Sequence, residues 1–241
     1  ALLSGIDIPH VLQSGIDMSR MSRSGSISEN KSLALAVFLV SNFVRGKDKL
    51  TLLTSDAVAG FSPWIEQLVA ESLGKDGKGI VPVIGEPIYE PSQYSADRMF
   101  VYITCSGADN AEEEYLIDSL EKTGVGVFKI EMSSPYELGA EMFRWEFAMA
   151  LVASVLFINP FDQPDVDKSK VIGIDDIRSL TKSDRVKYMD VNRSMNELLA
   201  SIRDGMYLAI LAYVPKRDDI KHLLQDFRSS ITTEFGVPTT L

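Results

Sequence analysis

The hydrophobic positions of this chain fall into short apolar runs separated by amphipathic stretches, which is typical of an α/β protein. Helical patterns separate most of these runs, and strands that alternate with helices predict a mainly parallel sheet with right-handed crossovers. The pattern therefore predicts a three-layer αβα sandwich around a five-stranded sheet. The five expected strands are 49–55, 79–85, 99–105, 125–132 and 154–158.

Three helices are expected between these strands. Ser62 and Pro63 have the residue types of an N-cap and a first helical residue, and Gly74 would end that helix. The second helix is expected over 109–121 and the third from 134 to about 152.

The pattern divides the chain into three parts. Residues 1–46 look helical, 47–182 form the α/β domain, and 183–241 form an appended subdomain with helical patterns at 192–203 and 218–230 around a strand-like run at 207–214. The tetrapeptide Ser-Gly-Ile-Asp occurs at 4–7 and again at 14–17. We interpret the two copies as a chance recurrence of a turn followed by a helix cap, because a repeat architecture needs several copies.

Charge and composition narrow the possible functions. The net charge of −10 argues against non-specific binding to nucleic acid or to an anionic membrane, but it leaves an anionic small substrate possible. Cys105 is the only cysteine, which fits a reducing, cytoplasmic setting. His10 and His222 are the only histidines and leave little material for a zinc site.

No apolar run reaches the length of a membrane span. The sequence does not begin with methionine, so we expect a piece of a longer protein.

The stretch from Asn159 to Lys170 is the first candidate site. It follows the apolar run 153–158, which reads as a buried parallel strand, and open α/β sheets place ligands at the carboxyl ends of such strands. The plainer alternative is an ordinary strand-to-helix turn with a solvated lysine.

Glu71 is the second candidate. It follows Trp64 by nearly two helical turns and shares a stripe with Leu68. A carboxylate on an apolar stripe must be paired or hydrogen-bonded, or else be poised to take up a proton, as a general base requires. The alternative is that Glu71 lies in a frayed last turn and reaches water.

Nucleotide-binding fingerprints are absent from the sequence. The segment 71–79 is rich in glycine and lysine but lacks the spacing of a phosphate-binding P-loop, and no G-x-G-x-x-G occurs.

Several motifs resemble glucose-6-phosphate isomerases, and especially the isomerase half of bifunctional transaldolase/glucose-6-phosphate isomerases. The stretch 159–170 resembles the family signature F-D-Q-x-G-V-E-x-x-K, with Asp165 in place of glycine and Asp167 in place of glutamate. The likeness covers most of residues 1–170 and is loose after Lys182. The other motifs that carry it are 46–49, 64–72 with Gly74-Lys75, 78–83, 85–87 and 143–146.

The resemblance implies a fold of the sugar-isomerase type and a function for each matching residue. Glu71 would move a proton between C1 and C2 of a hexose 6-phosphate through a cis-enediolate. Gln163 and Lys170 would contact the sugar and assist ring opening, with Lys75 also in the substrate site. The resemblance implies no metal and no organic cofactor, and it places the protein in glycolysis and gluconeogenesis.

Three departures from the family pattern qualify this expectation. The family histidine after the G-E-P segment is missing, so we expect either Tyr94 or Gln93 to lie nearby instead, or another part of the protein to assist ring opening. The family's phosphate-binding loop and its G-G-R segment would precede residue 1, and the bifunctional relatives continue past Leu241. We therefore expect a missing N-terminal sugar-isomerase domain, a homodimer, and little activity in this piece alone. Whether a transaldolase domain also precedes it is left open by the sequence.

Two alternatives to an enzyme remain open. The chain could be a sugar-phosphate-binding domain without catalysis, or a structural domain of a transaldolase fusion. The predicted topology itself raises a difficulty, because a helix that returns from a parallel strand would carry Glu71 to the sheet edge opposite Lys170.

Overall fold

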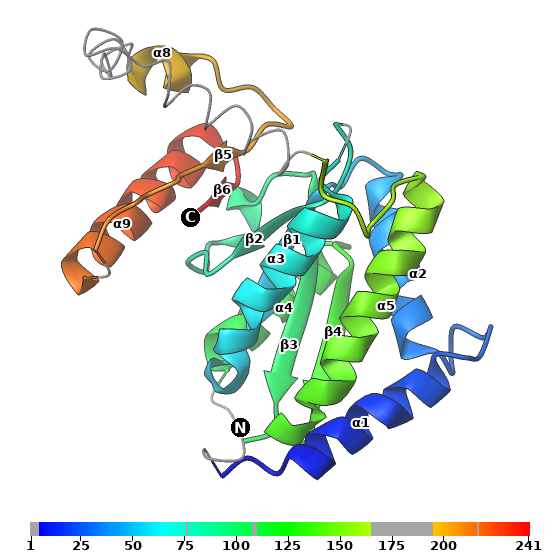
Figure 1. Cartoon of the computed structure of the whole chain (residues 1–241). Coiled ribbons are helices and arrows are strands. Elements are labelled where there is room, and N and C mark those ends of the chain that lie inside the picture. The colour runs from blue at the N-terminus through cyan, green and yellow to red at the C-terminus, as the bar shows by residue number, and fades with distance from the viewer. Residues whose placement is uncertain (1–4, 76, 108–109, 165–194, 216) are drawn as a thin grey trace, which may run out of the picture.

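The centre of the structure is a four-stranded sheet in which every strand pair is parallel (Figure 1). The structure, a computed structural model, describes residues 5–75, 77–107, 110–164, 195–215 and 217–241. The strand order is β2-β1-β3-β4. The strands are β1 (Lys49–Thr54), β2 (Val81–Ile84), β3 (Arg98–Cys105) and β4 (Val127–Met132). Four of the five predicted strands are therefore present, within a few residues of their expected bounds.

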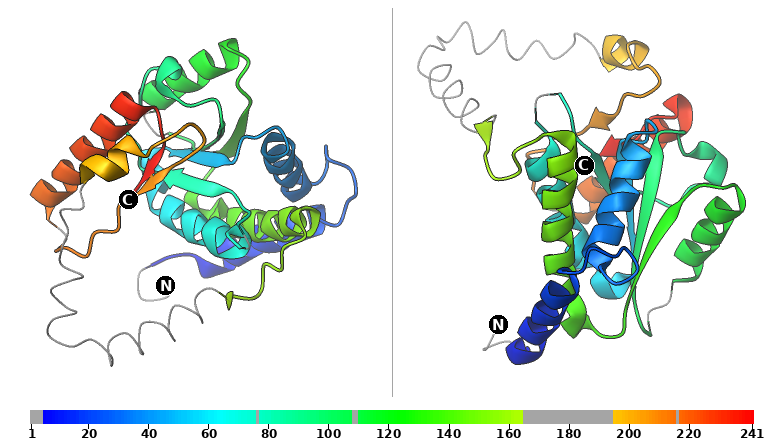
Figure 2. Two further views of the ribbon diagram at one scale, coloured as in Figure 1. Left: turned by 90° about the horizontal axis from the view of Figure 1, so that it is seen from above. Right: turned by 90° about the vertical axis from the view of Figure 1, so that its right-hand side faces the viewer.

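Helices cover both faces of this sheet, which confirms the predicted α/β fold class (Figure 2). One face carries α2 (Lys31–Phe43), α3 (Ser62–Leu73) and α5 (Leu138–Leu156), and the other carries α4 (Ala111–Lys122). The helix α1 (Ile8–Met21) crosses the start of α5. Short 3-10 helices at Asp56–Phe61, Pro91–Gln93 and Pro135–Glu137 join these elements.

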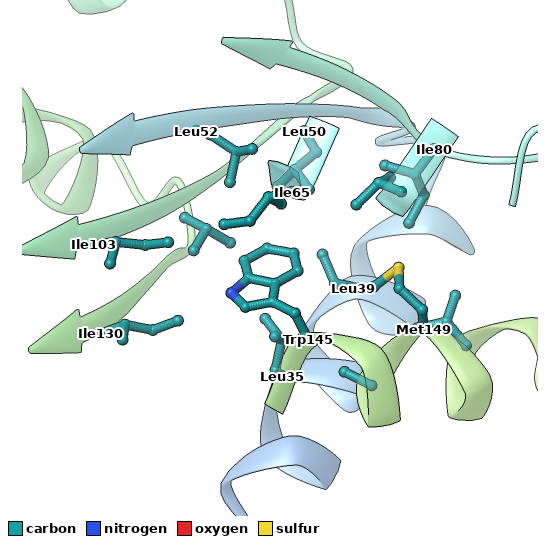
Figure 3. Packing of buried hydrophobic residues seen from close by; sticks show 14 of the residues in the cluster. Leu35, Leu39, Leu50, Leu52, Ile65, Ile80, Ile103, Ile130, Trp145 and Met149 are labelled. Atoms are coloured by element: carbon teal, nitrogen blue, oxygen red, sulfur yellow. The ribbon is translucent and has the colours of Figure 1, made fainter. Parts of the chain in front are cut away.

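The larger core lies between the sheet and the three-helix face (Figure 3). Trp145 of α5 is fully buried there, among Leu35 and Leu39 of α2 and Ile103 of β3. Because α2 contributes to the same core as the sheet, the helical start of the chain packs as part of this layer. The division at residue 46 stays a prediction. A smaller cluster on the α4 face contains Leu53, Phe100, Tyr102, Leu116, Ile117 and Leu120.

The fifth predicted strand, 154–158, is wrong. Residues 154–156 form the last turn of α5, and the cap residue Phe157 has a left-handed backbone at φ 56° that ends the helix before Ile158. The inner side of α5 is buried, but Val155 is 54% exposed and Phe157 is 90% exposed. The apolar run looked like a buried strand because apolar residues occupy both the inner and the outer side of this helix end.

The C-terminal part packs beside β2. It contains α8 (Met195–Ala200), α9 (Asp218–Phe235) and the parallel strands β5 (Leu208–Ala209) and β6 (Thr239–Thr240). The strand-like run predicted at 207–214 thus pairs over two residues only. Gln225 of α9 donates from Nε2 to the carbonyl oxygen of Gly85 at 2.9 Å, which ties α9 to the loop after β2. None of the helices in the described ranges combines the length and apolarity that a bilayer crossing requires.

A buried ion pair lies near the start of α5. Nη2 of Arg144 lies 3.1 Å from Oε1 of Glu141, and the two side chains are 7% and 3% exposed. Burial raises the pKa of Glu141 to about 7, although the positive charges of Arg144 and Lys31 oppose the shift; Glu137 adds to it. The remaining titratable groups around this pair are His10, Asp17 and Glu131.

We expect the folded protein to lose stability relative to its Glu141→Gln variant as the pH rises from about 4.5 to about 7. Over this range the unfolded chain ionises residue 141 before the folded protein does, which favours unfolding. The difference in unfolding free energy should change by up to about 3 kcal/mol. Urea unfolding of both proteins at several pH values measures it. The matched control is Glu121→Gln, because Glu121 forms an exposed pair with Lys129. A pH-independent difference would show that Glu141 titrates normally.

Candidate functional site

The helices α3 and α5 end at the same edge of the sheet, and this brings the two candidate motifs together. Each helix follows a strand and runs back toward the amino ends of the strands (Figure 1). The loop after α5 therefore lies beside the end of α3. A strand at 154–158 would have separated the two motifs, whereas the family resemblance required them to share one site. The separation does not occur, because residues 154–158 end a returning helix and do not form a strand. The candidate site consequently lies at the amino edge of the sheet.

The side chain of Lys75, directly after α3, holds the loop after α5. Its ammonium donates to the carbonyl oxygen of Asn159 at 2.6 Å, to the carbonyl oxygen of Asp162, and to Oδ1 of Asp162 at 3.0 Å. The Lys75 side chain is only 6% exposed. A buried ammonium needs such partners, so this contact fixes the loop against α3.

The loop also has its own hydrogen bonds. Asn159 accepts from the backbone N–H of Phe161 at 3.1 Å and donates to Oδ2 of Asp162 at 3.1 Å. Lys78 reaches the carbonyl oxygen of Leu156 over 3.4 Å. These contacts shape the turn that carries Gln163.

Both carboxylate oxygens of Glu71 accept a hydrogen bond from a side-chain amide. Gln67, one turn earlier on α3, donates to Oε1 at 3.0 Å, and Gln163 donates to Oε2 at 3.0 Å. The second contact joins residues 92 positions apart in the sequence. The structure thus brings together two of the predicted site residues, Glu71 and Gln163.

Glu71 is exposed, which corrects its predicted place on the apolar stripe of α3. The buried residues of α3 include Ile65, Val69 and Leu73, while Trp64 and Leu68 are only partly buried. The line from Trp64 to Glu71 therefore runs along the margin of the buried face. Glu71 lies in the last turn and reaches water, as the plainer alternative expected.

Tyr94 is not part of this site. It packs on the opposite face of the sheet, with its ring edge-on to Phe100 at 5.2 Å, and its hydroxyl accepts from the backbone N–H of Tyr89 at 3.1 Å. Burial raises the pKa of Tyr94 to about 12. The nearby Gln93 accepts from the backbone N–H of Glu90 at 3.0 Å. The third predicted partner, Lys170, lies outside the described residues, as do Asp165 and Asp167.

Three residues that position this site, Gln67, Asn159 and Asp162, lie within the motifs noted in the sequence, but no role was predicted for them from the sequence. Gln67 could have been found from its spacing of four residues before Glu71 on one helix. The contacts of Asn159 and Asp162 with Lys75 could not have been found from the sequence, because they depend on α5 returning to the amino edge of the sheet.

The arrangement offers an exposed carboxylate as proton acceptor and two amides that fix it. Such a carboxylate can remove a proton from a bound carbon acid if the substrate displaces one amide. In the described part of the chain, no group of three or more His, Cys, Asp or Glu residues could hold a metal ion.

Replacing Lys75 by methionine should free the loop while keeping the volume of the side chain. The loss of charge-assisted hydrogen bonds costs about 1.5–3 kcal/mol, so amide hydrogen exchange at 157–163 should become about 10–100 times faster. Hydrogen exchange followed by mass spectrometry measures this change. Lys78→Met is the matched control, because Lys78 is exposed and makes one long hydrogen bond to the same region. Equal loop protection in both variants would contradict the role assigned to Lys75.

Comparisons with known proteins agree with a sugar-isomerase relationship. The chain matches no protein-family model. It is 24% identical over 276 aligned residues to a glucose-6-phosphate isomerase of Prochlorococcus marinus, covering 100% of this chain and 49% of that protein. It is 22% identical over 203 residues to a glucose-6-phosphate isomerase of Methanocaldococcus jannaschii, covering 70% and 50%. Against the chloroplastic glucose-6-phosphate isomerase 1 of Arabidopsis thaliana, identity is 26%, covering 70% and 34%.

The chain thus spans half or less of the length of these relatives. A crystal structure of a glucose-6-phosphate isomerase from Chlamydia trachomatis has the same fold, with a TM-score of 0.53 at 15% identity, over 75% of this chain and 45% of that one. The sequence likenesses support a relationship to the sugar-isomerase family, and the structural likeness shows that the fold is shared.

Proposed function

We propose that this chain is the part of a glucose-6-phosphate isomerase that carries the catalytic base. The observation that supports the proposal most is the contact between Gln163 and Glu71, at 3.0 Å. It joins the two residues to which the family resemblance assigns proton transfer and sugar binding. The relatives with similar sequences are named glucose-6-phosphate isomerases, and the chain aligns with about half of the first two.

In this proposal Glu71 moves a proton between C2 and C1 of the open-chain sugar. The carboxylate takes the proton from C2 of open-chain glucose 6-phosphate, which leaves a cis-enediolate with its negative charge on O1. The proton of the C2 hydroxyl then passes to O1, and Glu71 returns its proton to C1, which gives fructose 6-phosphate. Gln67 keeps its hydrogen bond to Oε1 and so holds the carboxylate in place. Gln163 gives up its bond to Oε2 and donates to a sugar hydroxyl, which frees that oxygen for the proton.

The developing charge of the enediolate needs a cation or strong donors nearby. Lys170 is the proposed cation, and its placement remains a prediction. Lys75 serves differently from the sequence-based expectation: its ammonium is committed to the loop of Asn159 and Asp162, so it positions Gln163 and does not bind the sugar.

The exposure of Glu71 and Gln163 supports a site that another part of the protein completes. Proton abstraction from carbon works best where water is excluded. We therefore propose that a preceding sugar-isomerase domain supplies the phosphate-binding loop, and that a second subunit of a homodimer helps to cover the sugar. A transaldolase domain in the same chain is a further possibility that the family resemblance suggests.

Glu71→Gln should slow the exchange of solvent deuterium into C2 of glucose 6-phosphate. General-base catalysis contributes about 10²–10⁴-fold, so the exchange rate should fall by about that factor. The measurement is proton NMR of the sugar in deuterium oxide with the full-length enzyme. The matched control is Glu114→Gln, which removes an exposed carboxylate from α4 on the other face of the sheet.

Undiminished exchange in the Glu71→Gln enzyme would exclude Glu71 as the base. If the unmodified full-length protein binds a hydroxamate mimic of the enediolate but supports no exchange, the chain belongs to a binding module without catalysis. If the protein neither binds the hydroxamate nor supports deuterium exchange, the remaining interpretation is that the chain is a structural domain.

A further inference from the structure

The outer side of α5, which faces away from the sheet, is largely apolar, as its inner side is. Between residues 145 and 156 the only charged side chain is Glu146. Phe147, Leu151 and Val155 follow one another at a spacing of four residues, so they form a stripe along the helix. Phe147 and Val155 are 36% and 54% exposed, and α5 lies at the outside of the molecule (Figure 2). A helix that is apolar all round is normally buried all round.

Exposed apolar side chains continue from this stripe to the candidate site. At the start of the stripe, the ring of Phe143 stacks on that of Phe147, with centroids 5.8 Å apart. Beyond the end of the helix, Phe157 and Phe161 are 90% and 87% exposed, and they lie in the loop that leads to Gln163. Exposed apolar surface of this extent marks a place that another part of a protein covers. We call Phe143, Phe147, Leu151 and Val155 the α5 stripe.

The size of the α5 stripe favours a tethered partner over a free one. An α-helix is about 10 Å wide and rises about 1.5 Å per residue, so the 19 residues of α5 present an outer side of roughly 300 Å². Stable association of separate proteins usually buries about 800 Å² on each partner. A domain in the same polypeptide needs less, because the tether raises its effective concentration to about the millimolar range. The net charge of −10 disfavours a lipid surface as the occupant.

The relatives contain enough additional chain for such a domain. This chain aligns with 49% of the isomerase of Prochlorococcus marinus and with 50% of that of Methanocaldococcus jannaschii. The helix α1 packs on the start of α5, where Gly15 and Gly139 come into close contact. A domain that precedes α1 would therefore be attached close to the α5 stripe.

We propose that the preceding sugar-isomerase domain docks on the α5 stripe and on the adjoining Phe157 and Phe161. This inference rests on the proposed function, because it takes the domain that completes the sugar site to be the one that covers α5. Docking there extends apolar cover from the helix to the loop of Gln163. It thereby keeps water away from the carboxylate of Glu71, which proton abstraction from carbon requires.

The test places a photo-cross-linking side chain on the α5 stripe of the full-length enzyme. Replacing Phe147 by p-benzoylphenylalanine keeps an aromatic ring at that position, and mass spectrometry identifies the segment to which it cross-links. We expect cross-links within one polypeptide, to the domain that precedes α1. The matched control carries the same probe at Tyr115, which is 65% exposed on α4 at the other face of the sheet. It should give no cross-links to that domain.

Charged substitutions on the stripe test the docking itself. The double variant Phe147→Glu/Val155→Glu places two carboxylates in the proposed contact, and it should remain folded because both positions are exposed. Burying unpaired charges should weaken the docking by at least about tenfold. Limited proteolysis of the connection between the two domains should then become faster by about the same factor. Tyr115→Glu should leave the rate of cleavage unchanged.

The docking surface is wrong if the probe at position 147 cross-links to a second copy, to another part of these 241 residues, or to no segment at all. It is also wrong if the double variant is cleaved no faster than the unmodified enzyme. None of these readouts needs catalysis, so Glu71→Gln should leave the cross-links unchanged. Undiminished deuterium exchange in the Glu71→Gln enzyme, together with the expected cross-links, would therefore overturn the role of Glu71 and leave the docking surface standing.

Discussion

An ammonium group that leaves water must find oxygen atoms to replace its hydration shell, and Lys75 finds them in a loop far away in the sequence. Two carbonyl oxygens and one carboxylate oxygen surround its Nζ. The cost of burying the charge is therefore offset only when the turn at 159–162 is packed against the end of α3. The position of Gln163 over Glu71 follows from this constraint. A lysine that resembles a substrate ligand in the sequence thus serves as an internal support.

The helix α5 connects the structural and chemical parts of the molecule. Its middle supplies Trp145 to the main core, its start carries the Glu141–Arg144 pair, and its end leads into the loop that meets Glu71. Polar groups gather at the two ends, and the buried apolar residues occupy the length between them. A packed helix of this kind keeps its two ends at a fixed distance, because protein interiors are dense and do not deform gradually.

The sequence predicts the layers of this fold well and the site in part. Strands β1 to β4 could be located because β-rich runs alternate with capped amphipathic helices, and the end of α3 could be placed at Gly74. The run 154–158 could not be assigned correctly, since an apolar helix end that is exposed on one side has no clear period. That single error reversed the expected direction of the chain before Asn159, and with it the edge of the sheet where the site lies.

For the residues of the site, too, the sequence predicted some placements correctly and others not. Glu71 and Gln163 could be paired from motifs, which depend on local residue order. Tyr94 was misplaced, because its proximity in sequence to a family motif says nothing about which face of the sheet its ring joins. Lys75 could be noticed but not understood from the sequence, as its partners are 84 and 87 residues away.

The distance along the sequence between Lys75 and its partners also sets the order in which these contacts can form. During synthesis from the amino end, α3 is complete long before residues 159–162 exist, so the ammonium of Lys75 is at first hydrated. Contacts between distant segments carry a large loop-closure entropy and form late in folding. A nascent chain that stops short of Asn159 would contain all of α3, including Glu71, and would still lack the loop that places Gln163 against it.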